Sequence, residues 1–153
     1  MGWHGHPLHE RFPPSEPCTC DVCTYFCHRP GWPLVEEARL AIELGFGSSL
    51  MLELSGDGSF GVLSPAFRGN EGFFALTQYS HNGCTFLDHG LCSIHAQPFL
   101  PIECRYCHHD RMGCGKTCHQ ALEKEWHTGK GKRLVRQWQP FSRIPLAAIP
   151  FLI

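Results

Sequence analysis

The clearest helical pattern of hydrophobic and polar positions lies in residues 33–44. Apolar side chains recur there every three or four positions, which gives a helix one apolar face. The residues of that face are Leu34, Ala38, Ala41 and Ile42. Pro33 stands at the first turn and the acidic pair Glu36 and Glu37 follows it, and both features favour a helix start. Gly45 favours the end of the helix, so the pattern predicts an amphipathic helix over these residues.

Two short apolar runs after this helix have the length and composition of strands. Residues 50–54 and 60–63 flank a Ser-Gly-Asp-Gly-Ser sequence at 55–59. A glycine-rich turn between two apolar runs is typical of a β-hairpin. The run Phe-Phe-Ala-Leu at 73–76 predicts one further strand.

A second hairpin is predicted over residues 84–95, with its turn at 88–90. Cys84 and Cys92 would then stand on opposite arms. Directly paired side chains on neighbouring strands lie about 4.5–5.5 Å apart. That separation suits two ligands of one metal ion, and in an oxidising compartment it would also suit a cross-strand disulfide.

The C-terminal part of the chain predicts more helix. Residues 116–126 are rich in helix formers and predict a helix. The Gly-Lys-Gly-Lys sequence at 129–132 is expected to break this helix. Residues 133–138 are expected to continue it as a basic amphipathic turn. The tail 144–153 is apolar but twice interrupted by proline. We expect it to pack across the domain surface, and binding to a partner protein is the alternative.

These patterns together predict an α+β fold: a small cysteine-rich, metal-centred domain with β-hairpins and two main helices. Residues 1–17 carry four prolines and three histidines and are expected to form a flexible arm. The cysteine-cluster domain would span 18–128. Residues 129–153 would form a basic and apolar extension.

The high cysteine content of the chain favours a metal-binding function. The chain holds ten cysteines, and its 13 basic residues nearly balance 14 acidic ones. This balance gives no field that would attract nucleic acid or an acidic membrane, and no apolar run approaches the roughly 20 residues that span a bilayer. The first residues lack a secretory signal, so we expect a cytoplasmic protein. Clustered cysteines in a reducing compartment favour a metal site over disulfides.

The cysteines fall into three groups. The members are Cys18, Cys20, Cys23 and Cys27 in the first group, Cys84 and Cys92 in the second, and Cys104, Cys107, Cys114 and Cys118 in the third. A Cys-x2-Cys step folds tightly enough for two thiolates to reach one ion, and it recurs in zinc and iron–sulfur sites.

The order of these motifs resembles a known family. Cys20-x2-Cys23-x3-Cys27 precedes a Glu-rich helix start, Cys-Thr-Phe-Leu begins at Cys84, Cys-Ser-Ile-His begins at Cys92, and Cys-Arg-Tyr follows a proline at 104–106. This series is similar to that of the YkgJ-like CxxCxxCC family, described as a zinc- or iron-chelating domain. The resemblance covers about residues 18 to 107.

The chain departs from the family pattern in two places. The family's first cluster usually ends in adjacent cysteines, whereas His28 follows Cys27 here. The family's Arg-Pro before the Cys-Arg step is replaced by prolines at 98 and 101. His28 is therefore either a replacement ligand or lies outside the site.

The resemblance implies metal chelation by six cysteines. They are Cys20, Cys23, Cys27, Cys84, Cys92 and Cys104. We expect the first three to anchor one site and the later ones to complete it. A second site would use Cys107, Cys114 and Cys118 with His108, His109 or His119, and buried thiols are the alternative for that group. Cys18 lies just outside the Cys-x2-Cys and Cys-x3-Cys steps. It is expected to be either a further ligand or a redox-active thiol.

The metal and the reaction stay open on the sequence alone. Thiolate-rich sites suit zinc and an iron–sulfur cluster alike, while added histidine ligands favour zinc. The chain has no His-Glu-x-x-His or Gly-x-Ser-x-Gly motif, and the His-His-Asp run at 108–110 fits an exposed loop better than a catalytic base. Three functions fit these motifs. The first is a metal-chelating protein, and the second is an iron–sulfur redox or protein-modifying enzyme, such as the flagellin lysine methylases that carry a similar cluster. The third is a structural zinc module for a protein partner.

Overall fold

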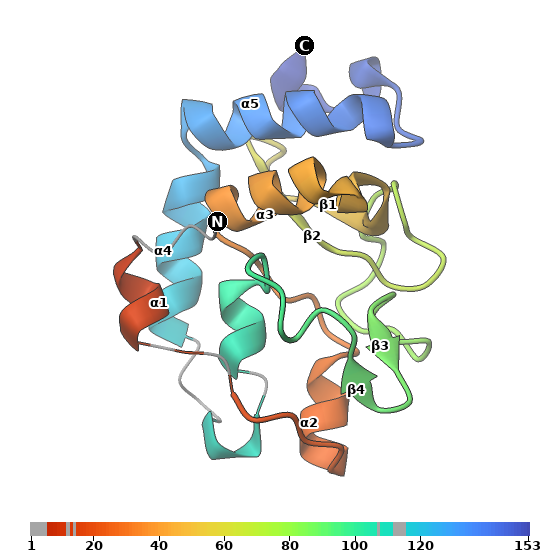
Figure 1. The fold of residues 1–153 in the computed structure, drawn as a ribbon. Coiled ribbons are helices and arrows are strands. Elements are labelled where there is room, and N and C mark those ends of the chain that lie inside the picture. Colours follow the sequence, from red (N-terminus) through yellow and green to blue (C-terminus); the bar gives the residue numbers. More distant parts are fainter. Residues whose placement is uncertain (1–5, 12, 14, 107, 112–115) are drawn as a thin grey trace.

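The computed structural model describes residues 6–11, 13, 15–106, 108–111 and 116–153. Helices and two small antiparallel sheets make up the fold (Figure 1), which confirms the predicted α+β class with two hairpins. The helices are α1 (Pro7–Arg11), α2 (Asp21–Phe26), α3 (Val35–Ala41), α4 (Lys116–Trp126) and α5 (Gly129–Trp138). The strands are β1 (Leu50–Leu54), β2 (Gly61–Pro65), β3 (Leu87–Asp88) and β4 (Leu91–Cys92).

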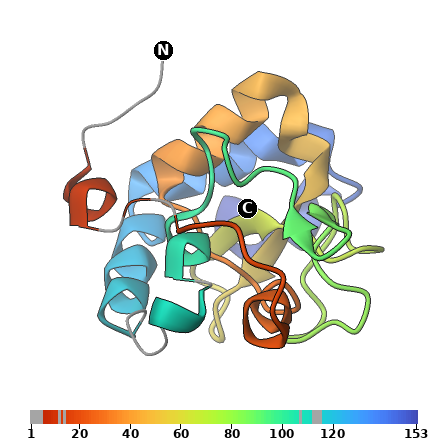
Figure 2. The same ribbon diagram turned by 60° about the horizontal axis from the view of Figure 1, so that its bottom comes forward.

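Single-turn helices fill much of the rest. A π-helical turn (Ile42–Phe46) extends α3, and 3₁₀ turns occupy Gly47–Ser49, Ile102–Tyr106, His109–Arg111, Gln139–Phe141, Leu146–Ala148 and Pro150–Leu152. Figure 2 brings α2 and the turns at 102–111 to the front of the molecule. This end carries most of the cysteines, whereas α5 and the C-terminus form the opposite end (Figure 1).

The first hairpin forms where the sequence predicts it. β1 and β2 pair antiparallel with Leu52 opposite Leu63. The Asp57 carboxylate closes the turn by accepting hydrogen bonds from the Ser59 hydroxyl and N–H and from the Ser55 hydroxyl. These hydrogen bonds, of which those from Ser59 have the largest effect, lower the pKa of Asp57 to about 2. The run at 73–76 makes a single parallel bridge from Phe74 to Leu52 in place of the expected strand.

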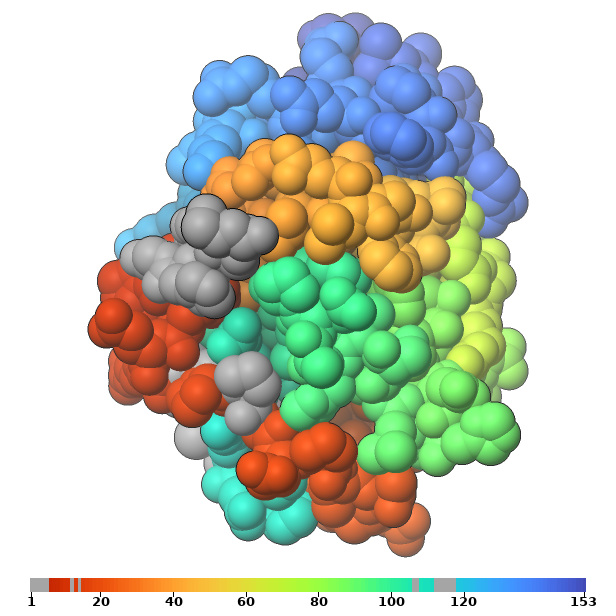
Figure 3. All heavy atoms as spheres, viewed as in Figure 1, coloured from red at the N-terminus to blue at the C-terminus, as the bar shows by residue number. Residues whose placement is uncertain are grey.

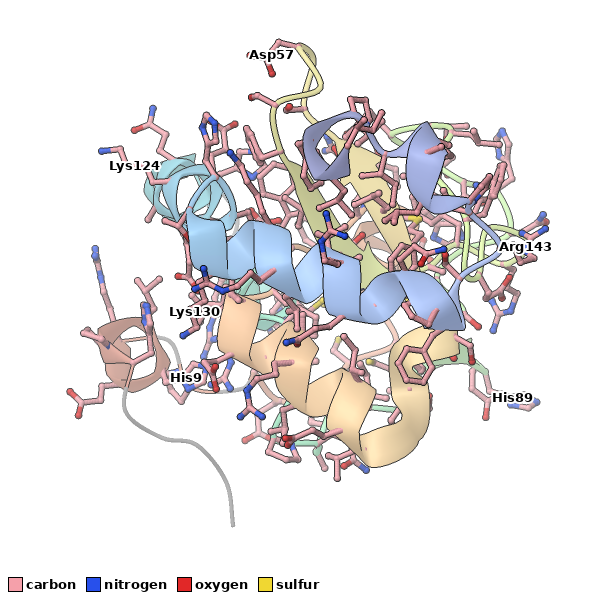
Figure 4. The ribbon with its side chains drawn as sticks, turned by 90° about the horizontal axis from the view of Figure 1, so that it is seen from above. His9, Asp57, His89, Lys124, Lys130 and Arg143 are labelled. Carbon is pink, nitrogen blue, oxygen red and sulfur yellow. The ribbon has the colours of Figure 1, made fainter. Side chains whose placement is uncertain are left out.

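The main core lies between the first hairpin, α3 and α5. Figure 4 looks down on α5 lying along α3. Trp126 and Trp138 are fully buried between these elements. Their indole N–H groups donate to the carbonyls of Pro33 (2.8 Å) and Gly47 (2.7 Å), which satisfies the only polar atom of each buried ring.

Gly129 and Gly131, which were expected to break a helix, lie inside α5. The break falls before them, at Thr128, whose hydroxyl caps α5 by accepting from the Gly131 N–H at 3.3 Å. A Cβ on Gly131 would lie 2.5 Å from the Trp126 carbonyl oxygen. Gly131 is therefore placed by a close approach of two helices. The tail then returns to the main core, where Ile144 and Ile149 are buried.

We expect Gly131→Ala to destabilise the protein by about 1–3 kcal/mol, because the added methyl group meets rigid backbone. Gly129→Ala is the matched control. A Cβ at Gly129 meets only the flexible guanidinium of Arg133 at 3.1 Å, so that change should be neutral or mildly stabilising. Urea unfolding of both variants measures the difference, and equal midpoints would contradict the proposed contact.

A buried carboxylate ties the core to the cysteine-rich end. Glu37 on α3 is fully buried. Its Oε1 accepts from the backbone N–H groups of Leu34 (2.8 Å) and Ile102 (2.9 Å), and its Oε2 lies 2.6 Å from His9 Nε2 and 4.0 Å from Arg105 Nη2. The residues expected to form an N-terminal arm thus include α1, which docks on α3 through His9. Glu37 also fixes the start of the 102–106 turn.

Candidate metal centre

Three of the cysteines converge where α2 begins. Cys20 is the N-cap residue of α2, and its Sγ accepts from the Cys23 N–H at 3.5 Å. The Cys18 Sγ accepts in the same way from the Cys20 N–H at 3.5 Å. Side chains two residues apart on an extended segment point to the same side, so Cys18 and Cys20 turn together toward the first turn of the helix.

The fourth candidate ligand comes from far along the chain. His109 begins the short helix His109–Arg111, and its Nδ1 lies 3.8 Å from Cys18 Sγ, 3.6 Å from Cys20 Sγ and 3.3 Å from Cys23 Sγ. All four ligand atoms lie within 4.8 Å of one another. The His109 backbone N–H also donates to Cys23 Sγ at 3.3 Å, which holds the two segments together.

These separations match tetrahedral coordination. Bonds of about 2.3 Å to sulfur and 2.0–2.1 Å to nitrogen place sulfur and nitrogen about 3.5–3.6 Å apart around a tetrahedral ion. The three sulfur–nitrogen distances in the structure, 3.3 to 3.8 Å, lie on both sides of that value. The group of Cys18, Cys20, Cys23 and His109, called here the Cys3His group, could therefore hold a metal ion.

The thiols of the group differ in their readiness to ionise. The Cys23 N–H and thiol lower the pKa of Cys20 to about 7, against an ordinary value of 9.0. Burial raises the pKa of Cys23 to about 12. Cys20 is exposed and Cys23 is buried. Cys20 thus supplies a thiolate near neutral pH, while Cys23 readily releases its proton to solvent only when a cation binds its sulfur.

Neighbouring residues position His109. Asp110 Oδ1 lies 3.4 Å from His109 Nε2, on the ring edge opposite the cysteines. A carboxylate at the second nitrogen fixes the orientation of a metal-binding imidazole and raises its basicity. Arg111 Nη1 donates to the carbonyls of Pro13 (2.6 Å) and Arg105 (2.7 Å). This side chain therefore holds the 109–111 turn against the segment that leads to Cys18.

The remaining sequence-predicted ligands lie elsewhere. Cys27 follows α2, four residues beyond Cys23 and thus about 6 Å farther along the helix, and it is not in the Cys3His group. Cys27, Cys84, Cys92 and Cys104 line a neighbouring cavity. Cys118 is buried in the main core on α4. Cys107 and Cys114 lie outside the described residues.

His109 is the candidate ligand that the sequence spacing did not assign to the first cysteine group. The sequence analysis predicted His109 only as a ligand of a second site with the cysteines at 107–118. A single histidine gives no local pattern that shows which distant residues it will contact. His28, which the sequence left as either a replacement ligand or a residue outside the site, lies outside the Cys3His group. Its Nδ1 is 3.1 Å from the Thr24 carbonyl oxygen.

Comparisons with protein-family models, with curated proteins and with solved structures found no match to this chain. The resemblance to the YkgJ-like family stays a prediction, based on the order of the cysteine motifs. Among the described helices, none has the length and apolar character needed to cross a membrane.

Proposed function

We propose that this chain is a zinc-binding protein whose ion is held by Cys18, Cys20, Cys23 and His109. The observation that supports the proposal is the agreement between the sulfur–nitrogen separations of the group and those of a tetrahedral site. One imidazole nitrogen among three sulfurs is a familiar zinc donor set. Copper(I) and iron–sulfur clusters favour sulfur ligands more exclusively.

The proposed role of the ion is structural. Four protein ligands complete a tetrahedral shell and leave no position for water or substrate, which distinguishes structural from catalytic zinc. The ion would join the start of α2 to the 109–111 turn, 86 to 91 residues later in the chain. Membership of the YkgJ-like family, with its description as a zinc- or iron-chelating domain, is consistent with this proposal and is proposed with it.

Elemental analysis tests the proposal. Protein purified with zinc present should contain one zinc per chain at the Cys3His group, and Cys23→Ser should lose it, because a serine hydroxyl is a poor zinc ligand. Cys118→Ser is the matched control, since Cys118 is equally buried but lies on α4 in the main core. It should keep the zinc.

Two results would contradict the zinc proposal. One is an equal zinc content in the wild type and Cys23→Ser. The other is retention of zinc by His109→Ala together with its loss from His28→Ala, which would make His28 the nitrogen ligand.

A further inference from the structure

A second group of cysteines surrounds a cavity beside the Cys3His group. The cavity has a volume of about 200 Å³. Its thiol-bearing residues beyond Cys18 and Cys23 are Cys27, Cys84, Cys92 and Cys104. They come from four separate segments: the end of α2, the approach to β3, strand β4 and the 102–106 turn. In Figure 3, the orange region that holds α2 lies between the green second hairpin and the teal turns on the lower half of the molecule.

The backbone holds these four cysteines in place around the cavity. The Cys84 N–H donates to the Cys27 carbonyl at 2.7 Å, which joins the end of α2 to the second hairpin. Cys92 pairs with Leu87 across that hairpin. Cys104 packs against Gly31, where an added Cβ would lie only 2.4 Å from its Sγ. The arrangement thus depends on a glycine at 31, which itself lines the cavity.

One polar atom at the cavity lacks a partner. His95 lines the cavity, and its Nε2 is buried with no hydrogen-bond partner among the described residues. Ile94 and Leu100, both buried, form part of the apolar wall of the same cavity. A buried polar nitrogen without a partner loses its hydrogen bond to water and gains none in return. A ligand with hydrogen-bond acceptors inside the cavity would supply that hydrogen bond.

The size of the cavity, and the lack of a close group of three ligands in it among the described residues, favour a polynuclear ligand over a single ion. Thiolates on one zinc ion lie about 3.8 Å apart, given zinc–sulfur bonds of about 2.3 Å. Within the described part of the chain, no three of the cavity's cysteines and histidines outside the Cys3His group bring their ligand atoms within 4.8 Å of one another. The volume of about 200 Å³ also exceeds by several times the roughly 30 Å³ of one water molecule.

We propose that this cavity binds a [4Fe–4S] cluster through Cys27, Cys84, Cys92 and Cys104, with His95 Nε2–H donating a hydrogen bond to a cluster sulfur. A cubane cluster presents one iron to each of four thiolates. Its sulfides are the acceptors that the His95 nitrogen lacks. This site is distinct from the zinc site, so the chain would hold two metal centres of different chemistry at one end of the fold.

Anaerobic reconstitution with ferric iron, sulfide and dithiothreitol tests the proposal. The wild type should take up about four iron and four sulfide per chain, with broad visible absorbance that dithionite bleaches. Cys84→Ala and Cys104→Ala should each lose at least half of the iron and keep the zinc. Cys118→Ala should keep both metals. Cys20→Ser should lose the zinc and keep the iron, which separates failure of one site from failure of the other.

Circular dichroism of each variant shows whether it folds. If Cys84→Ala or Cys104→Ala is unfolded, Cys92→Ser on the exposed hairpin replaces it. The proposal fails if the wild type acquires no bleachable absorbance, or if the cysteine variants hold as much iron as the wild type. It also fails if the cavity takes a second zinc in place of iron and Cys84→Ala loses it.

The role of His95 has its own readout. Hydrogen bonds to cluster sulfurs raise the reduction potential by stabilising the reduced, more negative state. His95→Leu should therefore shift the potential downward while the iron content stays the same. His89→Leu is the control, because His89 lies in the turn between β3 and β4, with a side chain 94% exposed and directed into solvent (Figure 4). An unchanged potential in His95→Leu would exclude the proposed hydrogen bond.

Discussion

Removal of zinc by a chelator is expected to loosen residues 15–27 and 108–111 together, although they lie far apart in the chain. The ion would join these two segments, and metal-binding free energy contributes directly to the stability of the segments it joins. With free zinc a hundredfold above its dissociation constant, that contribution is about 2.7 kcal/mol. Amide hydrogen exchange in both segments should then accelerate up to about a hundredfold on chelation.

The first hairpin, residues 50–65, provides the internal control for this experiment. It packs in the main core, and the ligands of the Cys3His group lie outside it, so its protection should not change. Loss of protection confined to 15–27 would show that His109 does not bind the ion. Loss across the whole chain, the hairpin included, would show that zinc supports the entire fold and not one end of it.

Glu37→Ala is expected to destabilise the protein by about 3–5 kcal/mol, the range seen when one partner of a buried ionic group is removed. The change leaves the N–H groups of Leu34 and Ile102 without their acceptor. It also removes the carboxylate that faces Arg105 and His9. Urea or thermal unfolding measures the loss.

Glu37→Gln is the matched variant, because its amide oxygen can still accept from Leu34 and Ile102. We expect a loss well below that of Glu37→Ala, chiefly from the weakened contacts with His9 and Arg105. Glu36→Ala is the surface control. The Glu36 carboxylate pairs with Arg39 (2.9 Å) on a partly exposed helix face, and such pairs contribute about 0–1 kcal/mol. Equal losses for Glu37→Ala and Glu36→Ala would contradict the role given to Glu37.

The same carboxylate gives the protein a defined pH response. Burial raises the pKa of Glu37 above its ordinary value of 4.5. A group with a raised folded-state pKa contributes stability that is fully present below the unfolded pKa and is lost as the pH rises through the folded one. The free energy of unfolding of the wild type relative to Glu37→Gln should therefore decrease from pH 4.5 upward. A pH-independent difference would show that burial does not govern this titration.

The sequence by itself determined the local elements. The apolar spacing in residues 33–44 and the Gly-Asp-Gly turn between two apolar runs are properties of neighbouring residues, so the helix and the first hairpin could be predicted. The tight spacing of Cys20 and Cys23 likewise indicated a metal site at α2, and the structure brings their sulfurs together. The run at 73–76 was different, because a strand needs a partner whose position the local sequence does not encode.

Only the tertiary structure decided which residue completes the Cys3His group. His109 reaches the cysteines because Glu37 holds the Ile102 N–H and Arg111 holds the Pro13 carbonyl, contacts that span 65 and 98 residues. No spacing rule predicts such contacts, since they arise from the packing of α3 against distant segments. Gly131 is a second residue whose role the local sequence did not predict. It has the local pattern of a helix break, but the adjacent Trp126 carbonyl makes it a packing residue within α5.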